Sequence, residues 1–158
     1  MRGLPILAAI LGILGLLPFL GCTIGIIAFP RHIPVPNLVQ AIIAYGAVIL
    51  AFLGGVHWGF ALEADPAITV PSLAATNRRR LTLGVVPSLI GWAALLVPLV
   101  ASPLIAIVLL IMGFLGTTLI EAQARQAGVM PVGYMALRWV LSAVVVLCLL
   151  IVLLARAF

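Results

Sequence analysis

Five long stretches of apolar residues alternate with short polar segments along the chain. They run from Leu4 to Phe29, Asn37 to Leu62, Leu81 to Ala101, Pro103 to Ile120 and Met135 to Ala155. A helix needs about 20 mainly apolar residues to cross the hydrocarbon core of a bilayer, because that core is about 30 Å thick. Each stretch is therefore predicted to be a transmembrane helix, and Pro, Gly and Asp residues mark the connections.

The composition agrees with this pattern. The 158 residues are 66% hydrophobic and 7% charged, with a mean hydropathy of +1.43, whereas about 25% of residues are charged in soluble domains. This excludes a water-soluble enzyme, a nucleic-acid-binding protein, a disordered tail and a disulfide scaffold. We predict one domain over residues 1–158, an all-α polytopic transmembrane helix bundle of five spans.

The arginines predict the orientation, because basic residues are enriched in short cytoplasmic loops. With five spans, six arginines share one side of the membrane and two the other. The six are Arg2, Arg78, Arg79, Arg80, Arg125 and Arg138, and the two are Arg31 and Arg156. The N-terminus is thus expected in the cytoplasm and the C-terminus outside. The longer connections, 63–80 and 121–134, are then cytoplasmic, and the first apolar stretch is expected to be an uncleaved span.

Small residues recur every four positions along the second span, at Ala47, Ala51, Gly55 and Gly59. Such a stripe lets another helix approach closely, so we predict that these four residues form a helix-packing face.

His57 lies on a different face of the same span and is the one titratable residue well inside an apolar stretch. An ionisable residue in a membrane is a functional candidate by default. A structural histidine that bonds to a neighbouring helix is the alternative, and the sequence favours neither.

Other polar residues are expected at a similar depth in the bundle, in its cytoplasmic third. The candidate ligand-binding set is His57, Trp58, Ser88, Thr117, Thr118 and Ser142. Glu121 and Arg138 flank the last cytoplasmic connection and are predicted to form an ion pair at the membrane interface, where such pairs contribute little. No carboxylate is expected in mid-membrane. No catalytic residue and no metal site can be named, because the zinc and phosphate-binding motifs are absent.

Three prolines inside predicted helices also carry information. Pro18, Pro87 and Pro98 lack the backbone N–H that a helix requires, so each leaves the carbonyl four residues earlier without its usual partner, at Leu14, Leu83 and Ala94. Freed carbonyls can line a site or bend a helix, and a bend is the commoner result.

The string Gly54-Gly55-Val56-His57-Trp58-Gly59, with Arg79-Arg80-Leu81 and Gly84-Val85-Val86-Pro87-Ser88 after it, resembles a family of small membrane proteins known as a domain of unknown function. Its eukaryotic relatives are called transmembrane protein sixty-nine and are associated with mitochondria. The resemblance covers the chain from about Asn37 to its end. It implies a multi-pass protein of the bacterial inner (cytoplasmic) membrane and brings no established activity.

Two functions are consistent with these observations. The first is a non-enzymatic accessory or assembly subunit of a larger energy-transducing membrane complex, with the lipid bilayer and other membrane proteins as partners and no nucleic acid. The alternative is a binder or transporter of a small apolar molecule near His57. No cofactor is expected beyond a bound lipid or quinone. An intramembrane enzyme is least favoured, because no pair of nucleophile and base can be identified.

Overall fold

The computed structural model describes residues 6–29, 34–62, 71–126 and 134–158. These ranges form the helices α1 (Ile6–Leu14), α2 (Leu17–Ala28), α3 (Val35–Leu62), α4 (Pro71–Val100), α5 (Pro103–Gln126) and α6 (Tyr134–Ala157). No strand occurs within them, so the all-α prediction is confirmed.

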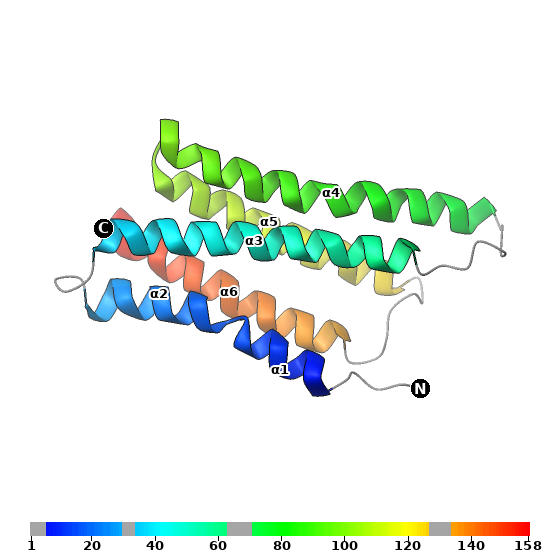
Figure 1. The fold of residues 1–158 in the computed structure, drawn as a ribbon, viewed down its shortest axis with the longest axis horizontal. Helices are drawn as coiled ribbons and strands as arrows, with labels where there is room; N and C mark the ends of the chain where they lie inside the picture. Colours follow the sequence, from blue (N-terminus) through cyan, green and yellow to red (C-terminus); the bar gives the residue numbers. More distant parts are fainter. Residues whose placement is uncertain (1–5, 30–33, 63–70, 127–133) are drawn as a thin grey trace.

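The helices lie side by side in one bundle (Figure 1), in which α1 and α2 follow each other as one bent rod. Helix α3 packs against α2, α4 and α5, and α6 packs against α5 and α2. The start of α1 and the end of α6 lie at opposite ends of the bundle (Figure 1). The central position of α3 places its side chains against most of the other helices.

Four segments of the described chain are long and apolar enough to cross a membrane: Ile6–Ala28, Val35–Gly59, Pro103–Gln123 and Met135–Ala157. Gly84–Val100, in α4, is a shorter apolar stretch. Large apolar side chains such as Phe52, Trp92 and Leu147 are exposed on the outside of the bundle. In a lipid solvent such exposure is expected, so the chain is a multi-pass membrane protein.

The first predicted span differs from expectation because it is broken at Gly15 and Leu16. The cause is Pro18, whose ring clashes with the carbonyl of Leu14 in a continuous helix. Helix α1 accordingly ends at Leu14, and α2 carries this proline in its first turn. At the break, the Tyr45 hydroxyl donates a hydrogen bond to the Gly15 carbonyl over 3.0 Å. Pro87, in contrast, lies inside a helix that continues past it.

Two other helices are longer than predicted. Helix α4 begins at Pro71 rather than Leu81, so it includes the three consecutive arginines, and α5 continues to Gln126 rather than Ile120. Proline is favoured in the first turn of a helix, and residues 121–126 are Glu, Ala, Gln and Arg, which have high helix propensity. Parts of both predicted cytoplasmic connections are therefore helical. Arg2 and Arg31 lie outside the described residues.

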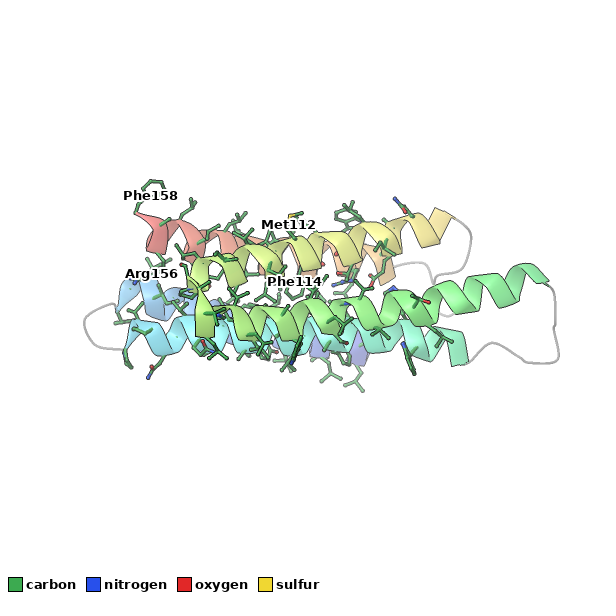
Figure 2. The ribbon with its side chains drawn as sticks, turned by 90° about the horizontal axis from the view of Figure 1, so that it is seen from above. Met112, Phe114, Arg156 and Phe158 are labelled. Atoms are coloured by element: carbon green, nitrogen blue, oxygen red, sulfur yellow. The ribbon has the colours of Figure 1, made fainter. Side chains whose placement is uncertain are left out.

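The core is built mainly from apolar side chains of α2, α3, α5 and α6, and α4 contributes Ala94. The Phe19 ring makes edge-on contacts with the rings of Tyr45 and Phe114, at centroid distances of 5.1 and 6.1 Å. Figure 2 shows Phe114 turned into the bundle, where it is buried, while Met112 lies on the outer side. This aromatic cluster connects α2 and α3 to α5.

The predicted packing stripe holds only at its start. Ala47 is buried and Ala51 half-buried, but Gly55 and Gly59 are exposed, and a Cβ added to either would meet nothing within 4 Å. Residues four apart drift by about 40° per step around a helix of 3.6 residues per turn, so the stripe turns away from its neighbour.

The close approach of α3 to α4 uses a spacing of seven residues instead, Ala47 and Gly54, which drifts by only about 20°. A Cβ on Gly91 would lie 2.8 Å from the Ala47 carbonyl oxygen, and a Cβ on Gly54 would collide with the carbonyl of Gly84. The glycines that permit this contact are therefore Gly54, Gly84 and Gly91.

Candidate functional site: a buried polar network

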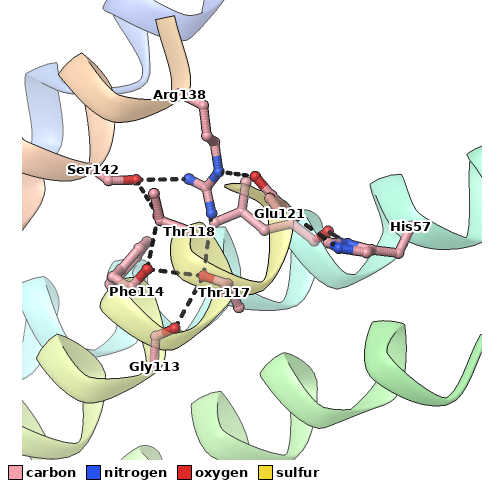
Figure 3. A network of polar contacts seen from close by, with 9 residues as sticks. His57, Gly113, Phe114, Thr117, Thr118, Glu121, Arg138 and Ser142 are labelled. Carbon is pink, nitrogen blue, oxygen red and sulfur yellow. Dashed lines mark hydrogen bonds and ion pairs between the residues drawn. The ribbon is translucent and has the colours of Figure 1, made fainter. Parts of the chain in front are cut away.

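Arg138, near the start of α6, is the centre of a buried network of polar side chains (Figure 3). Its Nε donates to Oε2 of Glu121 over 2.6 Å, its Nη1 to Oγ of Ser142 over 3.0 Å, and its Nη2 to Oγ1 of Thr117 over 3.2 Å. All three nitrogens of the guanidinium thus bond to α5 or α6. The network fixes these two helices against each other.

The hydroxyl groups of the network have one consistent donor order. Ser142 accepts from Arg138, and its Oγ lies 2.8 Å from Oγ1 of Thr118. Oγ1 of Thr118 in turn lies 2.9 Å from the Phe114 carbonyl, which can only accept. Each group therefore donates a hydrogen bond to the next: Arg138 to Ser142, Ser142 to Thr118, and Thr118 to the backbone carbonyl. Thr117 likewise donates toward the carbonyls of the turn before it.

Glu121 forms the predicted ion pair with Arg138, but it is completely buried among the helices, unlike the weakly contributing surface pair that we expected. The reason is the extra length of α5. Because the helix continues, Glu121 lies one turn beyond Thr117 and Thr118 and on the same side, facing α6. A charge this far from water requires a counter-charge, which the guanidinium supplies.

His57 lies beside the network from α3 and is also buried. Its Nδ1 is 3.0 Å from the Leu53 carbonyl oxygen. A carbonyl only accepts, so Nδ1 carries a proton, and in a neutral ring Nε2 is then the acceptor. Nε2 lies 3.9 Å from Oε1 of Glu121. That oxygen accepts no hydrogen bond from any residue that the structure describes.

Trp58 and Ser88 do not join the network. Trp58 is partly exposed and donates from Nε1 to the Leu81 carbonyl over 3.1 Å, and its ring covers Gly84. Ser88 lies against Gly54. Successive residues of a helix point about 100° apart, so the residue after His57 faces α4 rather than α5. Of the six candidates, the structure brings together His57, Thr117, Thr118 and Ser142.

Glu121 belongs at the centre of the site, a position that sequence reasoning did not give it. A usable signal exists in the spacings. Thr117, Thr118 and Glu121 are three and four residues apart, and Arg138 and Ser142 are four apart, so each set occupies one helix face. Two short polar faces of complementary charge at the same end of adjacent helices predict a shared buried network.

Two cavities flank the network on opposite sides. The larger, of about 400 Å³, is a groove between the bent α1–α2 rod, α3 and α6, and its apolar lining includes Leu11, Phe52 and Val56. Arg138 and Ser142 also line it. The smaller, of about 70 Å³, lies between α3, α4 and α5 and is lined by His57 and Thr117 among apolar residues.

The described residues contain no group of three or more His, Cys, Asp or Glu side chains that could hold a metal ion. His57, Glu121 and Arg138 offer hydrogen bonding, and an imidazole and a carboxylate can also exchange a proton, whereas a guanidinium stays charged.

A family model described as "Protein of unknown function (DUF3429)" matches residues 4–154. Two curated relatives are both named "Transmembrane protein 69". The one from Xenopus tropicalis is 39% identical over 89 residues, 56% of this chain and 32% of that protein. The one from Mus musculus is 39% identical over 83 residues, 52% of this chain and 30% of that protein. The matched part thus spans about a third of the relatives' own length. No solved structure matches.

Proposed function

Since the chain belongs to the family of proteins of unknown function DUF3429, we propose a function from the site alone: it binds a neutral lipophilic molecule whose polar end carries a hydrogen-bond acceptor. A quinone and an ester lipid share this chemistry. The observation that carries the proposal is the groove of about 400 Å³ with Arg138 and Ser142 in an otherwise apolar lining.

The size and lining of the groove fit such a ligand. Small-molecule sites are typically about 300–1,000 Å³, mostly apolar, with a few placed polar groups that fix the orientation. A guanidinium has five N–H donors, and the three bonds of Arg138 to Glu121, Ser142 and Thr117 engage only three of them. The remaining donors can serve a ligand carbonyl.

The charge of the site favours a neutral polar end over an anion. Glu121 already neutralises Arg138 at 2.6 Å. An anion in the groove would compete with that carboxylate, whereas a carbonyl only needs a donor.

The groove is open toward the lipid. Leu11 of α1 and Phe52 of α3 line it and are 59% and 66% exposed. Helix α2 packs against both α3 and α6, but α1, beyond the break at Gly15, packs against α6. A lipophile therefore has a lateral path from the bilayer between α1 and α3.

The test uses two matched tryptophan substitutions on α3. Val56→Trp fills the groove, whereas Val48→Trp adds the same ring on the exposed side of the helix, away from the groove. Protein purified in mild detergent is extracted and its lipophiles are identified by mass spectrometry. Binding of decylubiquinone and of dioleoylglycerol, a neutral ester lipid, is then measured with each variant.

We expect Val56→Trp to weaken binding about tenfold or more, which corresponds to about 1.4 kcal/mol, and Val48→Trp to leave it unchanged. Binding of the quinone alone identifies a quinone site, and binding of the ester lipid alone identifies a lipid site. Equal retention of both probes by the two variants would refute the proposal.

We further propose five spans in the bacterial inner membrane, with the network at the cytoplasmic end. Two features support this placement. The arginine distribution favours a cytoplasmic N-terminus, and the ends of α1 and α6 lie at opposite ends of the bundle (Figure 1). Protease protection of tags at the two termini tests it: cleavage of both tags from the same side would exclude an odd number of spans.

An accessory or assembly subunit is the second candidate. The observation in its favour is that Gly55 and Gly59 leave open space beside an exposed, lipid-facing part of α3, where another transmembrane helix can approach closely. In that case Gly55→Leu abolishes co-purification of a membrane partner, and Gly21→Leu, a glycine with equally open surroundings on α2, does not. Identical partners in both pull-downs would contradict this role.

A further inference from the structure

The unmatched carboxylate oxygen of Glu121 points to a site that the proposed ligand groove does not use. Oε2 of this carboxylate bonds to Arg138, but Oε1 faces the ring of His57 and receives no hydrogen bond from the described residues. Polar atoms buried without a partner are rare, and each requires an explanation. Here the group is a fully buried carboxylate, for which the cost is highest.

The bond from His57 to Leu53 decides which atom faces that oxygen. Because Nδ1 donates to the Leu53 carbonyl, a neutral ring presents the lone pair of Nε2 to Oε1 at 3.9 Å. Two acceptors then face each other. A proton on Nε2 turns this unfavourable contact into an ion pair.

We propose that His57 and Glu121 form a buried binding site for one exchangeable proton. The proton binds Nε2 of the ring, and the imidazolium then pairs with Oε1 while Arg138 keeps Oε2. Each oxygen of the carboxylate faces one cation. Uptake changes the net charge of His57, Glu121 and Arg138 together from zero to +1, and release restores zero.

The groups around the pair are few and can be named. From α5 the ring faces Glu121 and Thr117, and from α6 Arg138 reaches the other side of the carboxylate. From α4, the residues that line the small cavity together with the ring are Val86, Pro87 and Ile90, which are apolar. Glu121 is thus the one described anion that can stabilise an imidazolium here.

The cavity of about 70 Å³ supplies the route for the proton. It borders His57 on the side away from the groove. A volume of about 10–15 Å³ is enough to hold one water molecule, so this cavity has room for water beside the ring. In the proposal the proton reaches Nε2 through this water, and the site does not depend on whether the groove binds a ligand.

Nitrogen-15 NMR of histidine-labelled protein in lipid nanodiscs tests the proposal directly. The chain has two histidines, so a His32→Asn background leaves His57 as the only signal. The expected ring carries its proton on Nδ1 at high pH. As the pH is lowered, it gains a second proton on Nε2. In Glu121→Gln this second protonation is lost, whereas Thr23→Val, which removes a buried hydroxyl on α2 outside the network, retains it.

Three results would overturn the assignment: a neutral ring with its proton on Nε2, a ring that stays singly protonated at every pH at which the protein remains folded, or normal uptake in Glu121→Gln. The first two need no variant, so they decide the matter even if Glu121→Gln does not fold.

The route has its own test. Gly116 lines the cavity with open space beside it, and Gly21 has the same open surroundings far away on α2. We expect Gly116→Val to slow hydrogen–deuterium exchange at the ring severalfold and Gly21→Val to leave it unchanged. Equal exchange in both variants would exclude the cavity as the path.

Discussion

Replacement of Arg138 by methionine removes the only described cation that contacts Glu121 through a hydrogen bond, without a large change of side-chain length. Three hydrogen bonds between or within α5 and α6 are lost. Hydrogen bonds between membrane helices contribute about 0.6 kcal/mol each on average, so the bonds alone come to about 2 kcal/mol. The carboxylate is then left buried without its counter-charge, and breaking such a pair costs about 3–5 kcal/mol. The lost bonds are part of that cost, so we expect a loss of about 3–5 kcal/mol in the free energy of unfolding.

The assay is reversible unfolding of the purified protein by increasing fractions of SDS in mixed micelles, followed by circular dichroism or tryptophan fluorescence. Glu121→Gln combined with Arg138→Met removes the stranded charge. The double variant should therefore be more stable than Arg138→Met alone, and less destabilised than the two single changes added together. Additive losses, or a single variant that unfolds at the wild-type SDS fraction, would refute the view that the buried ion pair holds α5 to α6.

Two further changes test the packing by the same unfolding assay. Gly54→Ala places a methyl group against the backbone of α4 and should destabilise the protein by about 1–3 kcal/mol, as overpacking does. Gly55→Ala changes the next residue, which lies in open space, and should have little effect. Similar losses of stability in both variants would contradict a close contact between α3 and α4 at Gly54. Tyr45→Phe deletes the hydrogen bond to the Gly15 carbonyl and should lower the free energy of unfolding by about 1 kcal/mol, with increased proteolysis near the start of α1. Unchanged stability would mean that this hydrogen bond does not hold the break between α1 and α2 in place.

Much of the fold follows from the sequence because the bilayer imposes a simple rule. Apolar length alone located five stretches, and the helices lie where those stretches are. The ends of the helices did not follow from apolar length, because α4 and α5 extend into polar sequence through helix propensity. The break before Leu17 has a visible cause in Pro18, but its position relative to α3 depends on Tyr45, thirty residues away.

The candidate site was predicted in part. Helical depth was sufficient to select His57, Thr117, Thr118 and Ser142, because polar residues at one depth in a closed bundle tend to meet. Depth does not decide rotation, so Trp58 and Ser88 were included although they face the α3–α4 contact. The full burial of Glu121 could not be derived from hydropathy, because a hydropathy scale treats a carboxylate at the end of a span as solvated. To predict this burial, one must know that the Arg138 guanidinium faces the carboxylate.

The break at Gly15 and Leu16 has a mechanical consequence for the groove. Helices α2 to α6 share the aromatic and aliphatic core. Helix α1 instead forms a short arm beyond the break, and its residues line one side of the groove. A tilt of this arm about its two-residue joint changes the width of the entrance while the core and the Arg138 contacts keep their packing. For the ligand proposed above, molecules of different width would then fit by movement of the nine residues of α1 alone, and stiffening the joint is expected to narrow the range of molecules bound.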